Sequence, residues 1–121
     1  MDAQVKRALE RDRVIDITTT GRKTGQQRRI EIWFDNVDGK LFLSGLPGRR
    51  GWYANLVAEP NFTFHLKHSV IADLPAKATP IRDPNQKREI FSEILKKRGA
   101  EGDLEAWLQG SPLVEVELQG L

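Results

Sequence analysis

The 121-residue sequence contains no cysteine, and this absence excludes disulfides, thiolate catalysis and cysteine zinc sites. The sequence also lacks an apolar run of the roughly 20 residues that a membrane span needs. Residues 1–13 are charged and have no apolar segment of the kind found in signal peptides. We therefore expect a soluble cytoplasmic protein, and the length suits a single domain over residues 1–121.

Charge of one sign is missing from two stretches of the chain. Between Ile17 and Ile30 there are four basic residues and no acidic one, and after Arg98 there are five acidic residues and no basic one. The net charge is only +2. A concentrated basic segment on a nearly neutral chain favours a small anion as the ligand over nucleic acid, which usually binds a broad basic face.

Alternating apolar and polar residues predict strands, and apolar residues at helical spacing predict helices. The predicted strands are 14–20, 29–35, 40–45, 61–67, 70–81 and 113–118. The predicted helices are 2–12, 52–59, 84–98 and 103–109. Most strands follow each other without a long helical crossover, which favours an antiparallel sheet. About six such strands tend to curl into a barrel.

Local signals mark several element ends. Asp38-Gly39 predicts a type I′ hairpin turn, because both residues tolerate positive φ. Asp83 followed by Pro84 predicts a capped helix start, and Gly99 predicts its end. Two prolines within 70–81 predict a strand that is bulged or lies at a sheet edge.

The segment Thr18–Arg29 joins two predicted strands and combines glycines, threonines and cations. Gly21 and Gly25 permit a tight turn that brings N–H groups close to a ligand. Lys23 offers a mobile charge and Arg28 a planar fork. The segment is not a P-loop, because Lys23 does not follow a glycine. It predicts a cradle for phosphate or carboxylate, with a solvated basic hairpin loop as the alternative.

The segment Ser44–Leu56 is a second candidate for anion binding. A glycine-rich loop leads into a predicted helix, whose free N–H groups and dipole favour anions. The two arginines at 49–50 add charge, and Trp52 and Tyr53 are candidates to flank a planar ring. In the alternative interpretation Trp52 is a core anchor and Asn55 a helix-surface amide.

Other chemistry finds less support. His65 and His68 should lie on opposite faces of a strand and have no third ligand in view, so no metal site is expected. Ser44 and Ser111 lack a histidine and an aspartate that would form a triad. A site with cations, glycines and aromatics but no obvious nucleophile fits cofactor chemistry.

Two motifs together carry a family resemblance. The stretch Thr18–Gln26 with Arg28, and the stretch Trp52–Leu56 with Pro60 downstream, resemble the deazaflavin-dependent nitroreductase and quinone reductase family, which is related to the pyridoxamine-phosphate-oxidase-like flavoproteins. The resemblance implies an α+β fold, a six-stranded antiparallel split β-barrel with a few flanking helices. It also implies a reduced 8-hydroxy-5-deazaflavin coenzyme (F420) that passes a hydride to a quinone, a nitroaromatic or another small acceptor.

The resemblance also implies roles for particular residues. The turn 22–25 with Arg28 would meet the coenzyme's phosphate and acidic tail. Ser44 and the loop after it would border the ring, and Trp52 and Asn55 would brace that wall. The full set of implied cofactor-binding residues is Thr20, Gly21, Arg22, Lys23, Thr24, Gly25, Arg28, Ser44, Gly45, Trp52 and Asn55. The candidate catalytic residues, which would protonate the acceptor, are Ser44 and Tyr53, with water as the alternative.

Two other functions remain open on the sequence. An FMN-binding oxidoreductase would use the same barrel and the same cradle for one phosphate. A non-catalytic flavin or deazaflavin binder is the other, because some family members place tyrosines near the C-terminus and Tyr53 is the only tyrosine here. The oligomeric state, monomer or homodimer, is left open.

Overall fold

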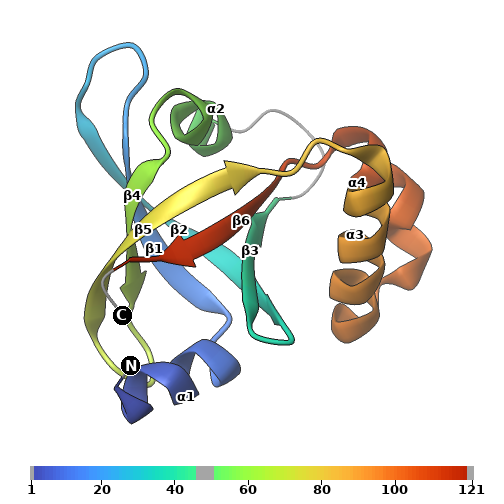
Figure 1. Cartoon of the computed structure of the whole chain (residues 1–121), viewed down its shortest axis with the longest axis horizontal. Coiled ribbons are helices and arrows are strands. Elements are labelled where there is room, and N and C mark those ends of the chain that lie inside the picture. The colour runs from blue at the N-terminus through green and yellow to red at the C-terminus, as the bar shows by residue number, and fades with distance from the viewer. Residues whose placement is uncertain (1, 46–50, 120–121) are drawn as a thin grey trace.

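The computed structural model describes residues 2–45 and 51–119, which form one β-barrel with helices at its ends and along one side (Figure 1). Its elements are α1 (Ala3–Arg11), β1 (Val14–Thr20), β2 (Gln27–Val37), β3 (Lys40–Ser44), α2 (Gly51–Ala58), β4 (Asn61–Leu66), β5 (Ala72–Pro80), α3 (Pro84–Arg98), the 3₁₀ turn η1 (Glu101–Asp103), α4 (Leu104–Gly110) and β6 (Leu113–Leu118). The order of strands and helices agrees with the sequence prediction. In the described residues, no helix has the length and apolar character needed to cross a bilayer.

The barrel is closed, with its strands in the order β1-β2-β3-β6-β5-β4 and all neighbours antiparallel. The prediction that 70–81 is an edge or bulged strand is wrong, since β5 pairs without interruption with β4 and β6. Pro75 has no N–H to donate to a neighbouring strand. Its carbonyl accepts from the backbone N–H of Gln119, just beyond the end of β6, and in a strand the nitrogen of a residue points to the same side as its carbonyl. The missing N–H therefore faces the end of β6, and no hydrogen bond to β4 is lost.

Alternation along each strand decides what lies inside the barrel. Ile15 and Ile17 of β1 are fully buried, and the rings of Phe34 and Phe64 meet edge to face with centroids 5.3 Å apart. Thr19 continues the buried face of β1 and is 2% exposed. A polar residue therefore ends the inward face of β1, at the end of the barrel where α2 lies.

The local signals behave as predicted. Asp38 and Gly39 have φ values of 53° and 89°, which a type I′ turn requires. The Asp83 carboxylate accepts from the N–H of Gln86 at the start of α3, and Gly99 ends that helix with φ 72°.

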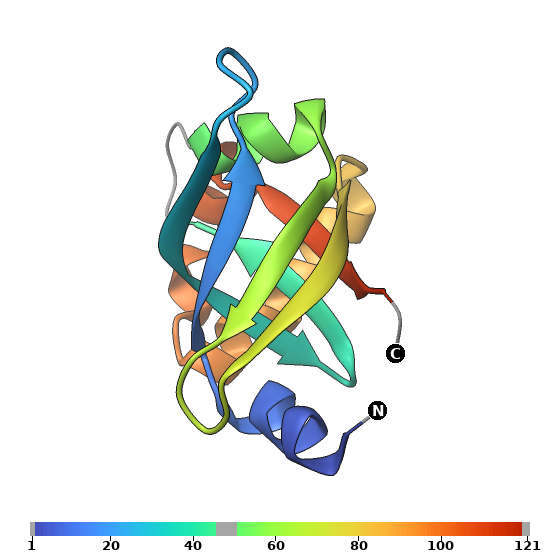
Figure 2. The same cartoon turned by 90° about the vertical axis from the view of Figure 1, so that its left-hand side faces the viewer.

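The helices divide between the barrel's ends and its side. Figures 1 and 2 show α1 at one end, and α2 at the opposite end beside the projecting β1–β2 hairpin. Helices α3 and α4 pack on the outside around Phe42, Phe91 and Trp107, in a second apolar cluster separate from the barrel core.

One arginine fastens α3 to β2. Arg98 makes two bonds with the carboxylate of Asp35, at 3.0 and 2.6 Å, and the two side chains are only 17% and 10% exposed. Its guanidinium also lies 5.6 and 5.5 Å from the ring centroids of Trp33 and Trp107. The guanidinium is thus paired with a carboxylate and also lies within cation–π distance of two aromatic rings.

We expect Arg98→Ala to lower the free energy of unfolding by about 2–4 kcal/mol, because it leaves the Asp35 carboxylate buried and unpaired. Arg88→Ala, on the same helix, breaks the exposed pair with Glu105 and should cost less than about 1 kcal/mol. Urea unfolding of both variants measures the difference. Equal losses would mean that the pair of Arg98 with Asp35 stabilises the fold no more than an exposed ion pair does.

Candidate functional site

The tip of the β1–β2 hairpin is a tight turn fixed by its own backbone. The N–H of Gly21 donates to the carbonyl of Gln26 and the N–H of Gly25 donates to the carbonyl of Gly21, both at 2.8 Å. Gly25 has φ 72°. A Cβ on Gly21 would lie 3.0 Å from the Thr24 hydroxyl and 3.2 Å from the Gln26 carbonyl. A Cβ on Gly21 would make its neighbours shift, and the positive φ of Gly25 is strained for most other residues, so the turn favours glycine at both positions.

Asn55 of α2 holds this turn against the barrel. Its carbonyl oxygen accepts from the backbone N–H and from the guanidinium of Arg22, at 3.1 and 3.3 Å. Its amide nitrogen donates to the hydroxyl of Thr19 at 3.2 Å. Asn55 is 7% exposed, so its interpretation as a helix-surface amide is wrong. One buried amide sets the position of Arg22 relative to α2.

The turn presents free hydrogen-bond donors together with positive charge. The N–H of Gln26 is taken by the Thr24 hydroxyl, but those of Lys23 and Thr24 have no partner among the described residues. The side chains of Lys23 and Arg28 are exposed and form no ion pair within the described part of the chain. Free N–H groups beside uncompensated cations are the ordinary features of an anion site.

A cavity of about 440 Å³ opens beside the turn, and we call it the tip chamber. Seven residues of the sequence prediction line it: Gly21, Arg22, Lys23, Thr24, Arg28, Trp52 and Asn55. Thr19, Ile30 and Gly51 complete the lining. Trp52 is 9% exposed and also belongs to the barrel core, so its interpretation as a core anchor is confirmed, while its role beside a planar ring stays a prediction.

A second cavity, of about 540 Å³, adjoins the first, and we call it the side chamber. Its lining residues are Arg22, Gly51, Tyr53, Ala54, Ile81, Arg82, Lys87 and residues 109–113. Arg22 and Gly51 line both chambers. Tyr53, a predicted catalytic residue, lies here, half-buried and edge to face with Trp52.

Four predicted residues line neither chamber. The Thr20 hydroxyl accepts from the Gln27 side chain, on the exposed part of the hairpin. Gly25 serves the turn itself. Ser44 ends β3, is 3% exposed, and its hydroxyl has no hydrogen-bond partner among the described residues; Gly45 follows it. The predicted arginine pair at 49–50 lies outside the described residues.

The lining residues that the sequence analysis missed include Thr19, Arg82 and Lys87. Thr19 carried a signal, because it follows Ile15 and Ile17 at the spacing of two that defines the inner face of β1. Arg82 and Lys87 carried none, since they reach the side chamber only through the position of α3 relative to α2.

A cavity larger than either chamber lies elsewhere, between α1, the β2–β3 hairpin and β6, with a volume of about 650 Å³. Lys6 and Lys40 face Glu10, Glu115 and Glu117 in its lining. Because positive and negative side chains line this cavity together, it favours neither an anion nor a cation. We therefore place the candidate site at the two cationic chambers.

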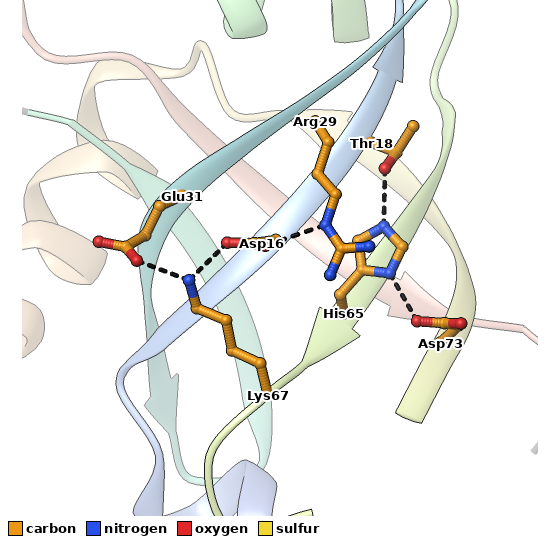
Figure 3. Close-up of polar contacts among 7 residues, drawn as sticks. All are labelled: Asp16, Thr18, Arg29, Glu31, His65, Lys67 and Asp73. Atoms are coloured by element: carbon orange, nitrogen blue, oxygen red, sulfur yellow. Dashed lines mark hydrogen bonds and ion pairs between the residues drawn. The ribbon is translucent and has the colours of Figure 1, made fainter. Parts of the chain in front are cut away.

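The outer face of β1, β2 and β4 carries a network of charges (Figure 3). Lys67 bonds Asp16 at 2.7 Å and Glu31 at 2.5 Å, and Arg29 bonds the other oxygen of Asp16 at 2.9 Å. The Lys67 ammonium, assisted by Arg29, lowers the pKa of Asp16. The same hydrogen bond to Asp16, assisted by Glu31, raises the pKa of Lys67.

Beside this network, His65 lies between Thr18 and Asp73, with its ring nitrogens 2.7 Å from the hydroxyl and 2.7 Å from the carboxylate (Figure 3). The hydrogen bond between His65 and the Asp73 carboxylate is the main cause that lowers the pKa of Asp73. The order carboxylate, imidazole, hydroxyl is that of a nucleophile triad. None of the three residues lines either chamber, and their bonds join β1, β4 and β5, which are neighbours in the barrel.

Comparison with known proteins identifies the family. The family model described as F420H(2)-dependent quinone reductase matches residues 1–119. The chain belongs to this family. It is therefore an oxidoreductase, as the sequence predicted.

Solved structures agree on the fold. The heme storage protein HutZ from Vibrio cholerae is similar with a TM-score of 0.76 at 13% identity, covering 99% of this chain and 91% of that one. A conserved hypothetical protein from Mycobacterium tuberculosis gives 0.75 at 14% identity, with coverage of 98% and 81%. An F420-H2 dependent reductase, FDR-A, gives 0.61 at 16% identity, with coverage of 88% and 95%. The predicted six-stranded split barrel is confirmed.

We expect Asn55→Ala to lower the free energy of unfolding by about 1–3 kcal/mol, because it leaves the Thr19 hydroxyl and the Arg22 N–H without their partner. Amide hydrogen exchange at Arg22 should accelerate. Val57→Ala, at an exposed position of the same helix, is the control and should leave this exchange unchanged. Slow exchange at Arg22 in both variants would show that the turn does not need the Asn55 amide.

We expect Asp16→Asn to lower the melting temperature at pH 7, with the deficit shrinking as the pH falls. The folded pKa of Asp16 lies below its unfolded value of about 3.9, so its stabilisation is complete above that pH and is lost as the pH falls through the folded pKa. Thermal melts from about pH 7 to pH 2 measure this. Asp38→Asn, in the exposed β2–β3 turn, should follow wild type throughout.

Proposed function

We propose that the protein binds the reduced deazaflavin coenzyme F420 by its anionic end at the tip chamber, and that it passes a hydride to a small acceptor such as a quinone or a nitroaromatic. The observation that carries this proposal is the β1–β2 turn. Its N–H groups of Lys23 and Thr24 have no partner among residues 2–45 and 51–119, and the cations Arg22, Lys23 and Arg28 line the same cavity.

The donor set fits a phosphate bearing an acidic chain. Backbone N–H groups of Lys23 and Thr24 are suited to the phosphate oxygens, because a tight turn aims them the same way. Arg28 and Lys23 are free to pair with further carboxylates. Gly21 keeps the turn compact where a side chain would collide with Thr24. The remaining wall, formed by Trp52 and Ile30, offers an apolar surface to a planar ring.

When bound, the reduced deazaflavin supplies a hydride, that is, one hydrogen nucleus with two electrons, and a proton must also reach the reduced acceptor. Tyr53 is the better placed of the two candidate proton donors, because it is half-buried and lines the side chamber. Ser44 is buried and lines neither chamber. We therefore assign the proton to the Tyr53 hydroxyl or to water that it orients.

FMN remains the second candidate cofactor. Its single phosphate meets the same turn, and a cavity of about 440 Å³ does not distinguish the two ring systems. The coenzymes differ in their acidic tails, so the extra cations beyond those that one phosphate needs favour F420.

We expect F420 to bind with a Kd below about 100 μM, which corresponds to roughly −5.5 kcal/mol. Lys23→Ala combined with Arg28→Ala should weaken that binding by about 100-fold or more, because two charge-assisted contacts of about 1.5–3 kcal/mol each are lost. Fluorescence titration measures the binding, and a thermal melt of each protein measures stability. The melting temperature should change little, because both side chains are exposed.

The matched control is Lys77→Ala with Lys96→Ala, which removes the same charge at exposed positions that line neither chamber. A similar loss of affinity in the control would reduce the effect to net charge. If neither F420 nor FMN binds, the cofactor assignment fails. If F420 binds but reduced F420 does not reduce a quinone or nitroaromatic, the protein is a coenzyme binder without turnover.

A further inference from the structure

The side chamber has a charge pattern that coenzyme binding at the turn does not explain. Its charged lining residues are Arg22, Arg82 and Lys87, and no carboxylate lines it among the described residues. Arg82 is exposed and has no hydrogen-bond or ion-pair partner in the described chain. The positive charges that line this cavity are not neutralised by a carboxylate in its lining, so the cavity favours an anionic ligand.

Lys87 is held in place yet keeps donors available. Its ammonium donates to the carbonyl of Ser111 at 3.2 Å and lies 5.8 Å from the ring centroid of Phe91. An ammonium has three N–H donors, so two remain after the bond to Ser111. The side chain is half-buried, so water screens its charge less and its field is stronger than that of a fully exposed lysine.

A buried hydroxyl gives a second, independent indication of a ligand. Ser111 lines the side chamber, is 3% exposed, and its hydroxyl has no hydrogen-bond partner among the described residues. A buried polar group without a partner is costly. An oxygen-bearing ligand in this chamber would supply that partner.

Part of the lining of the side chamber is apolar. Ile81 and Leu113 are 6% and 1% exposed, and Pro112 and Ala54 lie beside them in the lining. A lining that combines an apolar surface with cations is suited to a flat ring that carries an acid group at its edge. Because Arg22 and Gly51 line both chambers, a ring in the side chamber lies next to the tip chamber.

We propose that the side chamber is the acceptor site, and that it selects aromatic or quinone acceptors that carry a carboxylate, bound through Arg82 and Lys87. This inference rests on the proposed function, because it assigns the hydride acceptor to a chamber beside the one that holds the coenzyme. Arg82 is the specificity-determining residue, while Tyr53 faces the same ligand from α2.

The test uses two nitroaromatic probes of nearly the same shape, para-nitrobenzoate and para-nitrobenzamide. Calorimetric titrations are made on the protein saturated with oxidised F420, so that no turnover occurs. Wild type should bind the carboxylate about tenfold more tightly than the amide, as expected for one strong charge-assisted contact. The preference should shrink as salt is raised, because the chamber opens to solvent.

Arg82→Gln should reduce the preference to about twofold or less and leave the affinity for the amide and for F420 unchanged. Arg82→Lys, which keeps the positive charge, should retain part of the preference for the carboxylate. Arg88→Gln removes the same charge from α3 outside the chamber and should keep the full preference. In steady-state assays the loss should appear in the KM for para-nitrobenzoate and not in kcat.

The outcomes separate this inference from the proposed function. Equal affinity of wild type for both probes overturns the inference while F420 binding and turnover of the amide uphold the function. Weaker F420 binding in Arg82→Gln, with the probe preference intact, assigns the side chamber to the coenzyme's own acidic chain and also overturns it. If F420 does not bind and the protein alone still prefers the carboxylate through Arg82, the anion-selective site stands and the function fails.

Discussion

The barrel closes where β1 meets β4, and the rest of the molecule depends on that seam. Three residue pairs join the two strands, with residues 16–18 opposite 63–65. On the outer face, side chains reinforce the same seam: Thr18 bonds His65, and Lys67, just past the end of β4, bonds Asp16. Inside, Ile17 and Phe64 are fully buried. Backbone pairing, polar bonds and apolar packing therefore all act at one place.

Closure of the ring also determines where the functional residues lie. With β1 paired on both sides, Thr19 near its end contacts Asn55 of α2. The β1–β2 turn extends beyond the barrel beside that helix (Figure 2). The two family motifs, which are far apart in the sequence, meet through Asn55 and Arg22. Their co-occurrence in the sequence thus has a physical cause, since each is incomplete without the other.

The sequence was sufficient where the cause is local. The Asp38-Gly39 turn and the Asp83 cap depend on neighbouring residues, and both were predicted. The tight β1–β2 turn with its two glycines was predicted for the same reason. The prediction that β5 is an edge or bulged strand was wrong, because closure of the barrel pairs it with β6, which lies far along the chain. The burial of His65 and Asn55 escaped prediction because it depends on strand register and helix placement, which pattern and spacing do not contain.

Arg22 lines both chambers, and one guanidinium has a fixed number of donors. It already gives one of them to Asn55. Two anions bound at once must share what remains, so each lowers the other's affinity, and by thermodynamic linkage the penalty is the same in both directions. Departure of either charged ligand would therefore strengthen the binding of the one that remains, through a single shared arginine.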